Sequence, residues 1–122
     1  MLIDHGRDSV YSFPVESGES IVKKGLVNLQ CNGGAFSGAL YLTTHRLVFV
    51  GYILAATRKY MEDIPLTHIS AMTRGKSLFM IPNVLNVRTI EDKKLKFIVS
   101  GSGKWLFEIN KQKQAQVISA TI

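Results

Sequence analysis

The chain has 122 residues and a mass of 13.6 kDa, the size of a single domain whose core is large enough to be stable without disulfides or metal ions. Hydrophobic residues make up 46% of it and charged residues 20%, which excludes a disordered chain, and its longest apolar stretch, residues 47–57, is too short for a membrane-spanning helix. The net charge of +6 is uneven, because residues 1–22 are acidic and residues 93–122 are basic, and this basic part can attract anionic lipids or phosphates.

The N-terminal segment is expected to be a lead-in to the domain. Residues 1–18 show no clear periodicity, and one short strand or turn is expected around residues 10–15. From Ser20 onward, short apolar runs alternate with turn residues, a spacing typical of an all-β sandwich or barrel. We therefore predict a lead-in at residues 1–18 and one domain at residues 19–122.

Three consecutive strands are predicted after the lead-in. Val27, Leu29 and Cys31 alternate with polar residues, the pattern of a half-buried strand. Residues 32–34, Asn-Gly-Gly, tolerate a positive φ and predict a hairpin turn. Two further strands are predicted at residues 36–43 and 46–52, with a corner at Thr44-His45 between them. Because the links are short, these strands should form an antiparallel meander.

Four more strands bring the predicted total to about seven. Pro65 should stop the fourth, since proline cannot donate to a strand ladder, and Ile69 and Ala71 are expected on one face of the fifth. Leu85 and Val87 are expected to point inward from the sixth. The predicted strands span residues 58–64, 66–73, 84–90 and 95–99, with loops expected at 53–57 and 91–94 and a short apolar run at 78–81.

The periodicity changes near the C-terminus, where one helix is predicted over residues 104–119. Ser102 is expected to be its N-cap, with the hydroxyl accepting a bond from a first-turn amide. Trp105, Leu106 and Ile109 form an apolar stripe at helical spacing. A small, strongly bent pair of sheets leaves an open end, and a helix with a tryptophan in its first turn can close that end.

No motif for nucleotide or metal binding withstands inspection. The run at residues 101–104, Gly-Ser-Gly-Lys, departs from a phosphate loop because Ile98 stands where a glycine is needed and Trp105 where a Ser or Thr is needed. It is better explained as a strand-to-helix turn. The histidines lack the spacing of zinc ligands, so we expect no metal and no cofactor. They are His5, His45 and His68.

Catalytic groups are equally unsupported. Cys31 is expected to be a buried, inert thiol, because no local partner favours a nucleophile. The adjacent acids at residues 62–63 and 91–92 point to opposite faces of a strand, so neither pair forms an acid and base couple. We therefore predict that the protein is not an enzyme. A single cysteine also favours a reducing compartment, and the first residues do not resemble a secretory signal, so a cytoplasmic location is expected.

Two basic doublets are the candidate ligand-binding residues. Arg58 and Lys59 form one, Lys93 and Lys94 the other, and both lie at or near predicted loops, where binding groups usually sit. The alternative is that these residues only form a solvated, solubilising surface.

A family resemblance rests on residues 38–50, Gly-Ala-Leu-Tyr-Leu-Thr-Thr-His-Arg-Leu-Val-Phe-Val. This run resembles the signature of GRAM domains and of related bacterial PH-like domains. Residues 18–21, Gly-Glu-Ser-Ile, resemble the family's entry to the first strand, and residues 95–99 followed by a helix with a Trp are consistent with it. The resemblance covers about residues 16–118.

The resemblance implies a PH-like barrel of two nearly orthogonal antiparallel sheets with a C-terminal helix across one end. It also implies a non-catalytic module that binds proteins, phosphoinositides or its own copies, since bacterial members often form homo-oligomers. Arg46 would be a structural residue that bonds corner carbonyls or a carboxylate. The lipid site cannot be transferred, because PH domains place basic residues around the first hairpin and residues 30–44 contain no Lys or Arg.

Three functions follow from these observations. The first is a binding module for protein partners or for self-assembly, in which an exposed edge strand is a docking line. The second is peripheral attachment to an anionic, phosphoinositide-like membrane surface through the basic loops. A nucleic-acid-binding barrel is disfavoured, because the aromatic residues lie mainly at positions assigned to the interior.

Overall fold

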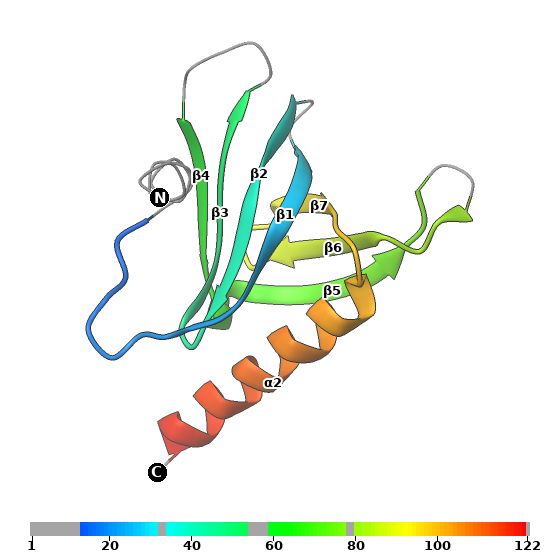
Figure 1. Cartoon of the computed structure of the whole chain (residues 1–122). Helices are drawn as coiled ribbons and strands as arrows, with labels where there is room; N and C mark the ends of the chain where they lie inside the picture. Colours follow the sequence, from blue (N-terminus) through cyan, green and yellow to red (C-terminus); the bar gives the residue numbers. More distant parts are fainter. Residues whose placement is uncertain (1–12, 32–33, 54–58, 78–79, 122) are drawn as a thin grey trace.

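The computed structural model describes residues 13–31, 34–53, 59–77 and 80–121, which form seven strands, one short 3-10 helix and one long α-helix (Figure 1). Of the strand or turn predicted around residues 10–15, residues 10–12 lie outside the described residues, and residues 13–15 belong to neither a strand nor a turn. In chain order the elements are β1 (Ile21–Cys31), β2 (Gly34–Thr43), β3 (Arg46–Ile53), β4 (Lys59–Pro65), η1 (Leu66–His68), β5 (Ile69–Gly75), β6 (Val84–Thr89), β7 (Lys94–Ile98) and α2 (Ser102–Thr121).

All seven strands belong to one antiparallel sheet with the order β4-β3-β2-β1-β7-β6-β5. Strand β1 pairs with β2 on one side and with β7 on the other, so the two sheets expected from the sequence are parts of one continuous sheet. In Figure 1, β5 and β6 run across the direction of β1–β4. The sheet is not closed, since β4 and β5 are its two end strands.

The segment predicted as a fifth strand at residues 66–73 is different in the structure. Its first three residues form η1, in which the Leu66 amide donates to the carbonyl of His45. The pairing of β5 with β6 then shifts between Ile69 and Ala71, which marks a β-bulge. Because a bulge inserts one residue, Ile69 is buried while Ala71 is exposed, and the prediction that they share a face is wrong.

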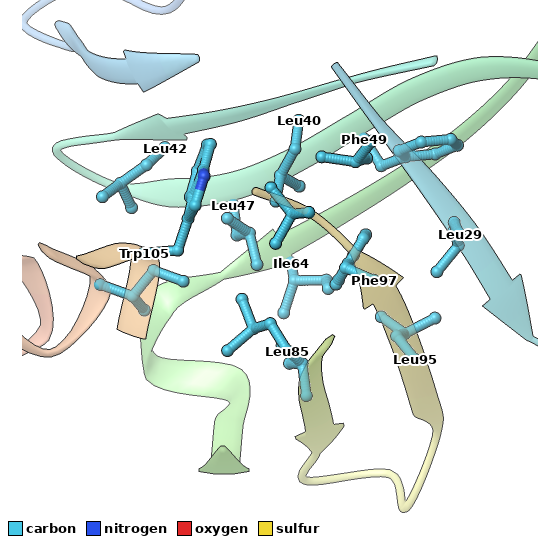
Figure 2. Packing of buried hydrophobic residues seen from close by; sticks show 14 of the residues in the cluster. Leu29, Leu40, Leu42, Leu47, Phe49, Ile64, Leu85, Leu95, Phe97 and Trp105 are labelled. Carbon is cyan, nitrogen blue, oxygen red and sulfur yellow. The ribbon is translucent and has the colours of Figure 1, made fainter. Parts of the chain in front are cut away.

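The core lies between the two parts of the sheet and α2, which packs against η1, β5 and β6. Figure 2 shows Trp105 of α2 in the same cluster as Leu42 and Leu85, and Trp105 is only 2% exposed. Ile109, one helical turn further, is fully buried. The predicted C-terminal helix is therefore confirmed, with its apolar stripe packed on the core, and Cys31 is buried in β1 as expected.

Ser102 is the first residue of α2, but it does not act as the predicted cap. Its hydroxyl donates to the carbonyl of Pro82, at an oxygen–oxygen distance of 3.1 Å. This bond joins the start of the helix to the segment before β6. The amides of Lys104 and Trp105 instead donate to the carbonyl of Gly101, whose φ of +72° suits a glycine.

Residues 13–20 cross the face of the sheet that points away from the main core, and Arg46 holds them there. Phe13 packs on Tyr41, Val48 and Val50, with an edge-to-face contact of 4.9 Å between the rings of Phe13 and Tyr41. The guanidinium of Arg46 bonds both carboxylate oxygens of Glu19, at 2.8 and 3.1 Å. Arg46 thus bonds a carboxylate, which is one of the partners expected for it from the sequence.

Candidate binding groove

A groove of about 800 Å³ crosses five strands of the sheet. It is lined by the end of β1, the start of β2 and residues 71–73, 86–88 and 94–96 of β5, β6 and β7. We call it the basic groove, because its lining includes Arg88, Lys94 and Lys96. Among the described residues that line it there is no Asp or Glu.

The strand register explains how these cations come together. Lys94 is the register partner of Arg88, and Lys96 that of Asn86, so both lysines lie beside β6. Between them, Leu95 is a core residue that is 1% exposed. Because side chains alternate along a strand, Lys94 and Lys96 project from the face opposite the core.

The polar part of the basic groove continues on both sides of Lys96. Gln30 of β1 is its register partner on one side, and Asn86 on the other side is paired with Thr73 of β5. The Asn86 side-chain amide donates to the Thr73 hydroxyl at 3.3 Å. Amide and hydroxyl groups next to cations are suited to hydrogen bonding an anionic ligand.

The cations of the basic groove are only partly compensated. Arg88 and Lys94 have the same charge and stand directly opposite each other, an arrangement that destabilises a sheet. Asp92 pairs with Arg88 at 3.1 Å, but both side chains are more than half exposed, so this pair is weak. No ion pair of Lys94 or Lys96 is found within the described part of the chain. An anion bound in the basic groove would relieve this repulsion.

The doublet Lys93-Lys94, expected to act together, is divided in the structure. Lys94 lines the basic groove, whereas the ammonium of Lys93 is paired with the carboxylate of Glu62. That carboxylate also accepts a hydrogen bond from the Tyr60 hydroxyl. Lys93 therefore contributes to the packing of β4 against the β6–β7 turn.

Of the other doublet, Arg58 lies outside the described residues. Lys59 is the first residue of β4, where its side chain is exposed, and it is the register partner of Tyr52 in β3. It is not part of the basic groove. The four basic residues named from the sequence therefore do not form one described site.

Tyr60 forms a second polar cluster on the core side of the sheet. Its hydroxyl lies 3.5 Å from the Cys31 sulfur and donates to Glu62, while its ring stacks on Phe36 at 4.0 Å. Burial, the hydrogen bond to Glu62 and the contact with Cys31 all raise the pKa of Tyr60 above its ordinary value. The phenol therefore remains protonated and acts as a structural donor.

Metal-binding clusters and membrane-spanning helices were both sought among the residues that the structure describes. No group of three or more His, Cys, Asp or Glu side chains is placed to hold a metal ion. Within the same residues, no helix is both long and apolar enough to cross a membrane.

Three solved structures, one of them a PH domain, resemble this fold. The C-terminal domain of an unknown protein from Leishmania infantum has a TM-score of 0.69 and 18% identity, covering 92% of this chain and 98% of that chain. The hSac2 domain of human phosphoinositide phosphatase Sac2 has a TM-score of 0.66 and 13% identity, covering 94% and 82%. The Vps36 N-terminal PH domain has a TM-score of 0.59 and 13% identity, covering 89% and 87%. At these identities the likeness shows the fold alone.

Comparison with protein families is decisive, although no curated protein matches the sequence significantly. The sequence model of the GRAM domain matches residues 7–119, which is nearly the whole chain. The chain belongs to the GRAM domain family. Residues 38–50, on which the resemblance was based, form the second half of β2, the β2–β3 corner and most of β3 in this GRAM domain.

Arg88 and Lys96 are the residues of this GRAM domain's groove that sequence reasoning missed. Lys96 carries a signal, because it alternates with Leu95 and Phe97 and must therefore lie on the outer face of its strand. Arg88 could be found only by pairing the strands around the 91–94 turn, which places it opposite Lys94. A basic doublet such as Lys93-Lys94 suggests that two neighbouring residues share a site, but neighbours along an extended chain point in opposite directions.

Proposed function

We propose that this GRAM domain, comprising residues 19–122 with a lead-in at 1–18, is a non-catalytic module that binds an acidic protein partner in the basic groove. The observation that carries this proposal is the presence of three cations and no acid in a groove of about 800 Å³. GRAM and PH-like domains are binding modules, which agrees with this assignment. The cations would give specificity and fast association with a partner of opposite charge.

The alternative function is attachment to an anionic membrane surface. It is favoured by Lys59 and Lys94, two of the predicted residues, whose side chains are exposed next to loops. It is disfavoured by Lys93, which is held by Glu62, and by the first hairpin, where residues 30–44 contain no Lys or Arg. Each basic residue near an anionic surface would contribute about 1 kcal/mol, so two lysines alone bind weakly.

The test compares two probes with a pair of charge-reversal variants. The probes are a short fluorescein-labelled peptide in which glutamate alternates with threonine, and vesicles of phosphatidylcholine with phosphatidylserine. Lys94→Glu/Lys96→Glu reverses charge in the basic groove, whereas Lys104→Glu/Lys111→Glu makes the same change on the exposed face of α2. Fluorescence polarisation measures peptide binding, and co-sedimentation measures vesicle binding.

We expect the peptide to bind and the groove variant to bind it about tenfold or more weakly, with a much smaller change in the α2 variant. Binding of vesicles but not of peptide would replace this proposal with the membrane alternative. If neither probe binds at low salt, or if both variants lose binding equally, the basic groove is not the binding site.

A further inference from the structure

The sheet has two end strands, β4 and β5, and β5 forms one wall of the basic groove. Among the described residues, no backbone hydrogen bond joins residues 71–75 to any element other than β6. An edge strand of this kind presents a row of unpaired amides and carbonyls to which an extended chain can pair.

The available part of the β5 edge has a definite length. At its start, the Ile69 carbonyl accepts a hydrogen bond of 3.0 Å from the Lys113 ammonium of α2, so this residue is already covered. Beyond the bulge, residues 71–75 continue without such a contact from α2 among the hydrogen bonds of the described residues. Five residues of extended strand measure about 16 Å, which is enough for a short segment to pair.

Charge distinguishes the two edges of the sheet. Strand β4 contains Glu62 and Asp63, which are already paired with Lys93 and Arg46, so those two cations are not available to an acidic segment laid along that edge. Strand β5 contains no acid, and its one charged residue is Arg74. An acidic segment that added to the sheet would therefore choose β5.

The side chains on the groove side of β5 are small, which leaves the cations accessible from this edge. Ala71 is the register partner of Arg88, and Thr73 that of Asn86. A strand added outside β5 would lie two strand spacings, about 10 Å, from Arg88. One arginine and one glutamate side chain can bridge that distance across the low wall made by Ala71.

We propose that the partner bound in the basic groove is an extended acidic segment that adds to the sheet as an eighth strand beside β5. This inference rests on the proposed function, because it assumes that the ligand of the basic groove is an acidic protein. Backbone hydrogen bonds to residues 71–75 would hold the segment. Acidic side chains at every second position would lie on the face of the sheet that carries the three cations, with Arg88 of β6 nearest and Lys94 and Lys96 of β7 one strand further away.

Hydrogen exchange of the full chain tests the strand pairing directly. In the presence of saturating glutamate–threonine peptide, exchange of alternate amides within residues 71–75 should slow, because those amides become hydrogen bonded. Amides within residues 60–64 of the other edge strand, β4, serve as the internal control and should not change. Slower exchange in β4 alone would overturn the assignment to β5.

A second probe tests the same point without changing the protein. Two versions of the same peptide are N-methylated at every second backbone amide, one at the odd-numbered positions and the other at the even-numbered positions. Each version keeps its charge but loses the backbone donors along one edge of the extended peptide. We call these two versions the two phases. In one phase binding should weaken about tenfold or more, and in the other it should change little. Equal binding of the parent and both methylated peptides would overturn strand addition.

A matched pair of variants completes the experiment. Thr73→Glu places an acid beside the added strand, while Thr67→Glu makes the same change at an exposed position of η1. Only the first should reduce peptide binding. If the parent peptide binds and depends on Lys94 and Lys96, but β5 exchange is unaltered, the proposed function stands and strand addition fails. If no peptide binds, the proposed function itself fails.

Discussion

Arg46 connects parts of the chain that are far apart in sequence. It bonds Glu19 at two oxygens, Asp63 at 2.7 Å and the carbonyl of Pro14 at 2.7 Å. The side chains of Arg46 and Glu19 are 10% and 0% exposed, so the ion pair is buried. A buried charge whose partner is removed is left without compensation, which costs far more than the loss of a surface pair.

We predict that Arg46→Ala lowers the free energy of unfolding by about 3 kcal/mol or more, because it leaves the Glu19 carboxylate buried without its cation. The matched control is Arg88→Ala, which breaks the exposed pair with Asp92 and should cost less than about 1 kcal/mol. Urea titration followed by circular dichroism measures both values. Similar losses in the two variants would contradict the structural role of Arg46.

The same ion pair predicts how stability depends on pH. The hydrogen bond from Arg46, together with that from Thr43, lowers the pKa of Glu19 from 4.5 to about 2. Because the folded-state pKa lies below the ordinary value, the ionised carboxylate stabilises the fold above about pH 4.5, and this contribution is lost as the pH falls toward 2. Glu19→Gln should be less stable at pH 7 and show a flatter decline between pH 4.5 and 2. A decline in Glu19→Gln as steep as that of the parent protein would assign the effect to other groups.

At the scale of single residues, burial was more predictable from the sequence than ligand contact. Trp105 and Cys31 were expected in the core, because their neighbours alternate with the correct period, and both are buried. The ion-pair partner of Lys93 was not predictable, since this partner is Glu62, which lies 31 residues earlier in β4. The functional importance of a surface lysine depends on such distant partners.

Among the elements, β2 and β3 approach each other unusually closely at Gly38. A Cβ atom added there would lie 2.1 Å from the Val50 carbonyl oxygen, whereas one added at Gly25 of β1 would lie 3.4 Å from Trp105. We predict that Gly38→Ala destabilises the protein by about 2 kcal/mol or more, because the backbone must shift. Gly25→Ala should change stability by less than about 1 kcal/mol, since it makes an ordinary contact and removes backbone freedom from the unfolded chain. Thermal unfolding monitored by circular dichroism compares them, and equal losses would contradict the close approach.

The type of each element was predictable where the pattern is local. Strands β1, β2, β3 and β6 follow from alternation, and α2 from a stretch with a stripe of apolar residues and no Pro. η1 was missed because its Leu66 amide donates to the carbonyl of His45, which lies about 20 residues earlier at the β2–β3 corner. The bulge was missed because it depends on Ser70, whose hydroxyl donates to carbonyls of β6. Both features are set by tertiary contacts that periodicity does not record.

At the scale of the whole molecule, one contact determines the architecture. Strand β1 pairs with β2 along most of its length and with β7 at Asn28, Leu29 and Gln30. This short pairing joins the first half of the chain to the last strand, which makes one sheet and creates the wall of the basic groove. No sequence pattern specifies it, because it forms between segments about 70 residues apart.

The sheet and α2 share one core, so we predict that the protein unfolds as a single unit. Trp105 is the chain's one tryptophan, and its fluorescence therefore follows the unfolding of this core. Trp105→Ala should cost about 3–5 kcal/mol, since it leaves a cavity where the helix meets the sheet. Phe107→Ala removes another aromatic ring of α2 that is 63% exposed, and it should cost less than about 1 kcal/mol. In the parent protein, tryptophan fluorescence and far-ultraviolet circular dichroism should give coincident urea transitions. An earlier fluorescence transition, or equal effects of the two substitutions, would show that α2 is an appendage and not part of the core.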